Sequence, residues 1–344
     1  MFQPKVSVMI PTYNQAKYIY NTVISVINQD YDNLEIVISD DASTDDTEAV
    51  VRKIINETPE RDIKYIKRTE NIGNIANYHD TLQNVITGDY VLNLDGDDFF
   101  IDMTYIRSCV ELIEQHSDIK LVFARQGTYF EKIDKVVYDK VNEKLPQIID
   151  GNKFLINFPK GHTIPHLTCL YRRQDAIELD FYSINIISSD WESILRLCIN
   201  NKIGFINRHV GIWRRHVSNE SRSINVNRLL ENLKYITSVS SFARCNTNLT
   251  VRQLAKWKKK MLIRNLIREI ITLRFLDKKK MKEFLLKLKD ELPYSYDILI
   301  RHPYYWAARF VCRHRALCRF VFTYLIKQPS ILDDLELYSS NPYS

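Results

Sequence analysis

The chain has little of several features that mark common protein classes. Only 8 glycines occur in 344 residues, so its turns must rely on Asn, Asp and Ser. The six cysteines form no CxxC pair, which predicts reduced thiols that mostly pack inside a cytosolic protein. No apolar run reaches the roughly 18 residues of a membrane-spanning helix. The first residues, MFQPKVSVMIPTYN, turn polar too soon for a signal peptide.

Two nucleotide-binding motifs are also missing. No GxGxxG opens the first predicted helix, which argues against a nicotinamide-type Rossmann site, and the absence of GxxxxGK[ST] excludes a P-loop. The composition, 45% apolar and 26% charged, is that of an ordinary globular protein. The length suggests two domains, or one large domain with an appendage. The net charge of +6 is uneven: residues 251–327 carry a net +14 and the remainder carries −8.

Strands and helices alternate along the first 100 residues. Apolar patterning predicts strands at 5–11, 34–38, 63–66 and 90–94, and helices at 18–29, 44–55 and 75–86. This alternation predicts an α/β fold with a mostly parallel, doubly wound sheet flanked by helices. Ligands of such sheets bind beyond the carboxyl ends of the strands. Polar clusters follow the predicted strands at residues 11–14, 40–41, 68–73 and 95–98.

The most informative of these clusters is the acidic turn in YVLNLDGDDFF, residues 90–100. Asp95, Asp97 and Asp98 come directly after a buried strand, where three carboxylates repel one another and lose hydration unless a cation joins them. Mg²⁺ or Mn²⁺ that carries phosphate oxygens suits such ligands. Gly96 would let the backbone approach a ligand closely. The sequence therefore favours a metal and nucleotide site here.

The acidic turn has two competing interpretations. It could simply cap a helix that begins near residues 102–104, since Asp is a common cap residue. It could also be a calcium loop, but an EF-hand counted from Asp95 needs Gly at the sixth place and Glu at the twelfth. The chain has Phe100 and Ile106 there, so the calcium loop fails on spacing.

Several stretches together resemble a family 2 glycosyltransferase of the GT-A fold. They are VSVMIPTYN, IVISDDASTDDT, ENIGNIANYHD and GDYVLNLDGDD with its DxD element, followed by PHLTCLYRR, SSDWESILRL and WRRHVSNES. The resemblance implies a GT-A catalytic domain over residues 1–227, with a nucleotide-sugar half (1–100) and an acceptor half (101–227). The remaining residues, 228–344, are predicted to form a basic, amphipathic helical region.

The resemblance also assigns candidate donor-binding residues. Those implied for the nucleotide are Pro11, Tyr13, Asp41, Arg68, Asn71, Gly73, Asp95 and Gly96. Asp97 is the first candidate metal ligand, Asp98 the second, and His216 lies where some relatives have a histidine that reaches the metal or diphosphate. The alternatives are a strand-ending turn at residues 11–13, helix caps at residues 40–41, a solvated cation at Arg68 and a structural role for His216.

An inverting transferase needs a carboxylate that removes the proton of the acceptor hydroxyl. The resemblance assigns this role to Asp190, which opens a predicted helix. The family usually has two acids at this place, whereas this chain has Ser189 before Asp190. A plain helix cap is the alternative for Asp190, and Glu192 is a poorer candidate for the base. Residues expected near phosphate or acceptor are Arg214, Arg215, His162 and His166.

The last 117 residues, 228–344, show helical patterns at 228–243, 251–275, 278–291 and 303–326. The last pattern combines aromatic residues with arginines, which is typical of a helix on an anionic membrane surface. Packing on the catalytic domain or homodimer formation accounts for the same pattern equally well. Nucleic-acid binding is not expected, because no binding module accompanies the charge.

The leading hypothesis is a metal-dependent (Mn²⁺ or Mg²⁺) inverting glycosyltransferase. It would move a sugar from a nucleotide sugar to a hydroxyl of a saccharide or lipid-linked acceptor in surface polysaccharide or glycan synthesis. A UDP-sugar is the donor that we expect. We expect a cytoplasmic location, with peripheral contact to the inner face of the membrane as an option. The alternative is a non-catalytic member that binds a glycan or a partner through its basic tail. A nucleotidyltransferase ranks lower, because PTYNQAKYIY has no glycine-rich loop.

Overall fold

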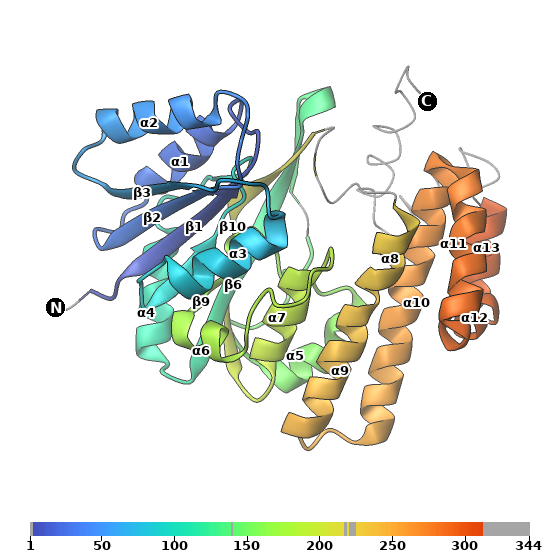
Figure 1. Cartoon of the computed structure of the whole chain (residues 1–344). Helices are drawn as coiled ribbons and strands as arrows, with labels where there is room; N and C mark the ends of the chain where they lie inside the picture. Colours follow the sequence, from blue (N-terminus) through green and yellow to red (C-terminus); the bar gives the residue numbers. More distant parts are fainter. Residues whose placement is uncertain (1–2, 139, 217–218, 220–224, 312–344) are drawn as a thin grey trace. The chain divides into compact units, whose positions relative to one another are not determined.

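The computed structural model describes residues 3–138, 140–216, 219 and 225–311 (Figure 1). Its contacts divide the chain into two compact units, Met1–Asn219 with Phe242–Asn248, and Glu220–Ser241 with Leu249–Ser344. The predicted domain boundary after residue 227 stays a prediction. Within the described ranges, no helix combines the length and apolarity needed to cross a bilayer.

The first unit is built on one sheet of ten strands. Four strands form its parallel part: β1 (Val6–Thr12), β2 (Leu34–Asp40), β3 (Asp62–Lys67) and β4 (Tyr90–Asn93). β1 pairs in parallel with both β2 and β4, and β3 lies outside β2. The predicted α/β fold with a parallel central sheet is confirmed. The carboxyl ends of β1, β2 and β4 therefore meet at one edge, as the polar clusters require.

The other half of the sheet joins residues far apart in the sequence. β9 (Leu170–Arg172) lies antiparallel between β4 and β6 (Ile119–Phe130). β10 (Lys202–Arg215) runs parallel to β6 and antiparallel to the short β5 (Phe99–Phe100). The two remaining strands are β7 (Lys135–Tyr138), on β6, and β8 (Ile148–Asp150), on β10. β10 carries the chain back to the residues that follow the acidic turn.

Helices cover both faces of the parallel strands (Figure 1). Apolar residues of α1 (Ile19–Ile27), α2 (Thr47–Glu57) and α4 (Tyr105–Gln115) share one core with residues of β1, β2 and β4. α3 (Asn74–Asn84) packs against β1. Each fully buried aliphatic side chain in this core contributes roughly 1.5–3 kcal/mol to folding. This core fixes the strand ends that carry the acidic turn.

Shorter helices complete the first unit. They are α5 (Gly151–Asn157), α6 (Arg173–Glu178), α7 (Ser189–Cys198) and the 3₁₀ turns η1 (Glu131–Ile133), η2 (Phe158–Lys160) and η3 (His166–Thr168). Three cysteines, Cys109, Cys169 and Cys198, are buried free thiols, and Cys245 is exposed. Cys312 and Cys318 lie outside the described residues.

One buried carboxylate, that of Glu35, ties the amino-terminal ends of β1 and β2 to the loop before β4. It accepts hydrogen bonds from the Ser7 hydroxyl, from the Thr87 N–H at 2.9 Å and from the Lys64 ammonium at 2.5 Å. Burial alone would raise the pKa of Glu35, but these donors outweigh it and lower the pKa to about 2. Glu35 is therefore ionised and fully paired in the folded chain.

The second unit is helical. Its helices are α8 (Val226–Asn232), α9 (Lys234–Asn246, whose last residues belong to the first unit), α10 (Val251–Leu276), α11 (Lys278–Glu291), α12 (Pro293–Ile300) and α13 (Pro303–Val311). The helix predicted over 228–243 is two helices that meet at Leu233. α10 begins with a capping box between Thr250 and Gln253, which satisfies amide groups of the first turn. The helix predicted over 303–326 is described only as far as residue 311.

Candidate functional site

The acidic turn lies between β4 and β5, at the carboxyl edge of the parallel strands. One carboxylate oxygen from each of Asp95, Asp97 and Asp98 lies within 4.8 Å of the others. Asp97 and Asp98 are buried, with 6% and 2% of their surfaces exposed. Burial, followed by the charges of Asp97 and Asp95, raises the pKa of Asp98 well above its usual range. The three carboxylates converge on one point, as the sequence predicted.

The turn is held against β1 and α1 by its main chain. The Gly96 N–H donates to the Pro11 carbonyl at 3.1 Å, and the Thr22 hydroxyl donates to the Gly96 carbonyl at 2.9 Å. A side chain at Gly96 would collide with Thr12 and Gln15. Glycine is therefore required here for close packing of the turn on β1. Whether it also faces a ligand stays a prediction.

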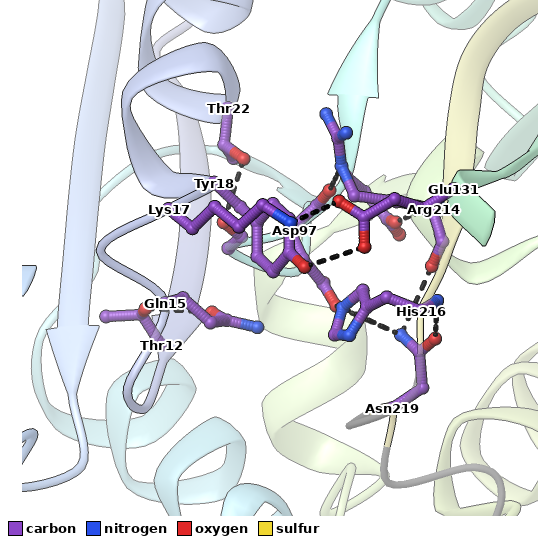
Figure 2. A network of polar contacts seen from close by, with 12 residues as sticks. Thr12, Gln15, Lys17, Tyr18, Thr22, Asp97, Glu131, Arg214, His216 and Asn219 are labelled. Atoms are coloured by element: carbon purple, nitrogen blue, oxygen red, sulfur yellow. Dashed lines mark hydrogen bonds and ion pairs between the residues drawn. The ribbon is translucent and has the colours of Figure 1, made fainter. Parts of the chain in front are cut away.

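Residues at the end of β10 and just after it complete the acidic cluster (Figure 2). His216 Nε2 lies 2.7 Å from Asp97 Oδ2, and the Asn219 amide donates to the same oxygen at 3.1 Å. The Arg214 N–H donates to Asp98 Oδ1 at 2.8 Å, and Arg214 Nε donates to the Asp97 carbonyl at 2.9 Å. Of the predicted set, the structure thus brings His216 and Arg214 to the acidic turn.

An aromatic side chain from the start of α1 supports both basic residues. The Tyr18 ring stacks on His216 with 4.6 Å between the ring centroids, and the Arg214 guanidinium lies 5.1 Å from the Tyr18 centroid. The Tyr18 hydroxyl donates to Glu131 at 3.0 Å, and Glu131 accepts from Lys17 at 2.7 Å (Figure 2). This network links the β1–α1 loop to η1, which follows β6.

Asp190 lies in the first turn of α7. Burial raises the pKa of Asp190; His166 lowers it, and the charge of Asp95 raises it further. His166 Nε2 lies 2.9 Å from the Tyr182 hydroxyl, and burial lowers the pKa of His166. The charges of His166 and Asp95 thus both act on the Asp190 carboxyl, and these three residues form the electrostatic neighbourhood of Asp190.

Tyrosine side chains connect this neighbourhood to the acidic turn. The Tyr78 hydroxyl donates to Asp95 Oδ1, and the Tyr78 ring stacks on Tyr182 with 5.0 Å between the centroids. The rings of His166 and Tyr78 also form a T-shaped pair, with 5.2 Å between their centroids. Burial and the charge of Asp95 raise the pKa of Tyr78, which keeps its hydroxyl a donor. Tyr78 therefore orients one carboxylate of the cluster.

The remaining candidates on the nucleotide side have partners within the fold. Asp41 accepts from the N–H groups of Ile72 and Gly73, at 2.8 and 2.9 Å, and Asn71 accepts from Gly73 at 3.1 Å. Gly73 has φ +88°, a conformation that favours glycine at the start of α3. These bonds fix the loop at the carboxyl end of β3.

Two further candidates of this side differ in their freedom to meet a ligand. Arg68 donates to Asn77 and Asp80, each at 2.7 Å, so it is anchored on α3 and is not a solvated loop cation. Tyr13 is 47% exposed and lies directly after β1. The contribution of these residues to nucleotide binding stays a prediction.

Three candidates contact residues that belong neither to the acidic turn nor to the electrostatic neighbourhood of Asp190. Arg215 is buried, and its guanidinium lies 4.5 Å from the Trp213 ring centroid. His162 Nδ1 lies 3.0 Å from the Asn142 side-chain oxygen. Glu192 pairs with Arg196 at 2.8 Å, one helical turn further along α7, which agrees with its lower ranking as a base.

Sequence reasoning missed the supporting residues Tyr18, Tyr78, Glu131, Tyr182 and Asn219. Tyr78 and Asn219 stand inside ENIGNIANYHD and WRRHVSNES, so the motifs that carried the resemblance contained them. Tyr18, Glu131 and Tyr182 stand in no such motif. Only the pairing of β6 with β10 brings Glu131 close to the end of β10.

The acidic cluster fits a divalent cation. Its donors are carboxylate oxygens, the ligand type that Mg²⁺ and Mn²⁺ prefer. A cation would also offset the repulsion that raises the pKa of the buried Asp98. Asp97 and Asp98 are the residues that would hold it, with Asp95 and His216 beside them.

The family model described as Glycosyl transferase family 2 matches residues 7–179. The chain belongs to this family. An uncharacterized protein of Mycobacterium tuberculosis is 25% identical over 212 residues, which cover 61% of this chain and 58% of that protein. The chain therefore spans little more than half the length of this relative. The Escherichia coli enzyme WfaP, a UDP-Glc:α-D-GlcNAc-diphosphoundecaprenol β-1,3-glucosyltransferase, is 34% identical over 128 residues, 37% of this chain and 47% of WfaP.

Solved structures of glycosyltransferases share the fold. Staphylococcus aureus TarS 1–349 in complex with UDP-GlcNAc aligns with a TM-score of 0.64 and 18% identity, over 90% of this chain and 91% of that one. The mannosyltransferase PcManGT of Pyrobaculum calidifontis, in complex with GDP-Man and Mn²⁺, aligns with a TM-score of 0.56 and 14% identity, over 99% and 89%. The chain described here therefore shares the fold of these two proteins.

Proposed function

We propose that this chain transfers a sugar from a nucleotide sugar to a hydroxyl of a saccharide acceptor, with inversion and with dependence on Mn²⁺ or Mg²⁺. The observation that carries the proposal is the convergence of Asp95, Asp97 and Asp98 at the carboxyl edge of the sheet, in the electrostatic neighbourhood of Asp190. The three carboxylates of the acidic turn suit a metal-bound diphosphate, and Asp190 suits the role of proton acceptor. The family membership sets the reaction class.

The named ligands of the relatives support a choice of donor class. A UDP-sugar is our first choice, because TarS was solved with UDP-GlcNAc and WfaP is named for UDP-Glc. PcManGT was solved with GDP-Man and Mn²⁺, so GDP-sugars are the second class to test. The diphosphoundecaprenol in the name of WfaP makes lipid-linked saccharides one acceptor class for this chain.

The proposed roles divide the chemistry between two groups of side chains. When bound, a divalent cation would neutralise the charge that grows on the departing nucleoside diphosphate. Asp97 and Asp98 hold its place, and Arg214 fixes their geometry through its hydrogen bonds to Asp98 Oδ1 and the Asp97 carbonyl. Asp190 accepts the proton of the attacking hydroxyl, a task for which burial, by raising its pKa, suits it.

Calorimetric titration of UDP tests the donor site. We expect UDP to bind in the presence of Mn²⁺ and to lose affinity when a chelator is added. Asp97→Asn should abolish the metal-dependent part of the affinity. Asp32→Asn is the matched control. Asp32 is exposed and precedes β2, so it lies at the amino-terminal end of this strand, whereas the acidic turn lies at the carboxyl ends of the strands. Equal UDP affinity in the wild type and Asp97→Asn would contradict the metal role.

Sugar transfer from UDP-sugars to saccharide acceptors tests the base. Asp190→Asn should keep metal-dependent UDP binding and reduce turnover by about 10²–10⁴-fold, the usual contribution of a general base. Undiminished turnover would remove Asp190 from the mechanism. If UDP, GDP and dTDP all failed to bind with Mn²⁺, the catalytic proposal would be wrong.

A further inference from the structure

A pocket of about 350 Å³ lies between α1 and β5, next to the acidic turn. Its volume falls in the range of small-molecule sites. Asn21 of α1 and Asn28, the residue that caps the carboxyl end of α1, lie about two helical turns apart and so share one face of the helix. The other wall consists of Phe99, Ile101 and Met103. Nothing in the donor and base assignments uses this pocket.

Arg214 is the only charged residue among those that line the pocket. Its guanidinium lies 5.1, 5.1 and 5.4 Å from the ring centroids of Tyr18, Phe99 and Tyr129, which hold the cation by cation–π attraction. Within the part of the chain that the structure describes, its two terminal nitrogens have no hydrogen-bond partner. Figure 2 shows the guanidinium extending away from His216. The pocket therefore contains a fixed cation with a free donor fork, the geometry that binds carboxylate or phosphate.

The rest of the lining suits a sugar ring. The amides of Asn21 and Asn28 are exposed, and among the described residues they have no partner, whereas the Gln29 amide is already bonded to Asp102 and Ile106. Free amides donate to and accept from hydroxyl groups. Ile101 and Met103 are 43% and 61% exposed, which offers apolar contact to the C–H face of a pyranose.

We propose that this pocket binds the anionic group of a saccharide, a carboxylate or a phosphate carried by a sugar residue. This inference rests on the proposed function, because it concerns the glycan that a glycosyltransferase would hold. The bound sugar is not the one that receives the transferred residue but another residue of the acceptor chain. Arg214 connects this pocket to the acidic turn, because its Nε donates to the Asp97 carbonyl and its N–H donates to Asp98 Oδ1.

The test measures binding of glucuronate, glucose 1-phosphate and glucose to the full chain by ligand-observed NMR. Each titration is run twice, with chelator alone and with saturating UDP and Mg²⁺, a diamagnetic ion that leaves the ligand signals sharp, so that binding at the donor site is recognised by displacement. We expect at least one anionic sugar to bind roughly fivefold or more tightly than glucose, with no displacement by UDP. The carboxylate and phosphate probes distinguish the two sources of the charge.

Variants locate the binding. Asn28→Asp adds a negative charge to the pocket wall and should weaken anionic-sugar binding roughly two- to fivefold. Asn56→Asp makes the same change on the exposed face of α2 and should leave the affinity for anionic sugars unaltered. Arg214→Gln should abolish the preference for anionic sugars. Equal affinity for glucose and the anionic sugars, equal effects of the two Asn→Asp changes, or displacement by UDP would each overturn the proposal.

Titration of UDP with Mn²⁺ into the same samples separates this inference from the proposed function. UDP binding without anionic-sugar binding overturns the pocket assignment and leaves the transferase in place. Anionic-sugar binding without binding of any nucleotide supports the pocket and overturns the catalytic role. Absence of both overturns both. Thermal unfolding of each variant, followed by circular dichroism, shows whether a lost affinity reflects a lost fold.

Discussion

The ring of Tyr18, just before α1, stacks on the imidazole of His216, just after β10, with 4.6 Å between the centroids and 26° between the planes. The hydroxyl of Tyr18 is fixed in turn by Glu131 at 3.0 Å. In this orientation of the ring, His216 Nε2 lies 2.7 Å from Asp97 Oδ2. Tyr18 therefore acts as a positioning residue for the histidine beside the proposed metal site (Figure 2).

Replacing Tyr18 should weaken metal binding although Tyr18 is no ligand. Tyr18→Leu removes the aromatic face, worth roughly 0.5–1.5 kcal/mol, and should raise the Kd for Mn²⁺ in the presence of UDP by about two- to tenfold. Tyr18→Phe keeps the face and should change it less. Calorimetry of Mn²⁺ binding makes the measurement, with Tyr20→Leu, an exposed position on α1, as control. Equal effects of Tyr18→Leu and Tyr20→Leu would show that the stack is incidental.

The pH profile of turnover should report the raised pKa of Asp190. A general base works only when deprotonated, so kcat/KM should rise as pH increases through the pKa of Asp190. Because burial raises that pKa, the acidic limb should lie above the range of an exposed aspartate, near pH 4. A profile that stays flat down to pH 4 would contradict this role. Asp32→Asn should leave the limb unmoved.

Glu35 should stabilise the fold at neutral pH and lose this effect in acid. Its pKa is about 2 in the folded chain against a reference value of 4.5. A depressed pKa gives stability that is present above the unfolded value and is lost as pH falls towards the folded value. This difference in pKa corresponds to a contribution on the order of 3 kcal/mol to the free energy of unfolding at pH 7.

Urea unfolding of Glu35→Gln against wild type, at pH 7 and pH 3, measures the Glu35 contribution to the free energy of unfolding. The deficit of the variant should be large at pH 7 and smaller at pH 3. Glu57→Gln, on the exposed end of α2, should cost less than about 0.5 kcal/mol at both. A deficit independent of pH would assign the effect to packing and not to the paired charge.

The second unit offers a test of membrane contact. Tyr304 and Trp306 on α13 are 66% and 58% exposed, and such aromatic residues beside arginines suit an anionic lipid surface. The wild-type protein should therefore co-sediment with phosphatidylglycerol vesicles, and a smaller fraction should be bound at high salt. The double variant Tyr304→Ser, Trp306→Ser should show a reduced bound fraction. Leu286→Ser, equally exposed on α11, is the control. Unchanged sedimentation of the double variant would exclude this surface as the contact.

Local patterns in the sequence were enough for the parallel half of the fold. Apolar runs and β-branched residues predicted β1 to β4 to within about two residues. β1, β2 and β4 are buried on both faces, which leaves a near-continuous apolar run, whereas β3 is only partly buried. The acidic turn was also predicted directly, since three carboxylates that follow a buried strand need a positive counter-charge. Helix starts were less accurate: α2 begins at Thr47, not at residue 44, because Asp45 and its neighbours form the preceding turn.

What the sequence did not show depends on contacts between distant residues. Glu131 and Tyr18 meet because β6 pairs with β10, a register that no local pattern encodes. The sequence leaves open whether Arg68 contacts the nucleotide or is a solvated loop cation, and it does not show that the fold gives Arg68 the partners Asn77 and Asp80 of α3. The helix break at Leu233 also lies inside an uninterrupted helical pattern. Tertiary packing decides such points, and propensity does not.

The pairing of β10 with β6 shifts register between Ile206 and His209 and again between His209 and Gly211. Side chains alternate between the faces of a strand, so each irregularity changes which residues beyond it point to a given face. Arg214, which supports the acidic turn, and Arg215, which packs on Trp213, are neighbours in the sequence with different surroundings. The bulged segment thus decides which face of the sheet each arginine occupies: a single insertion or deletion there would turn both Arg214 and Arg215 to the opposite face without altering either residue.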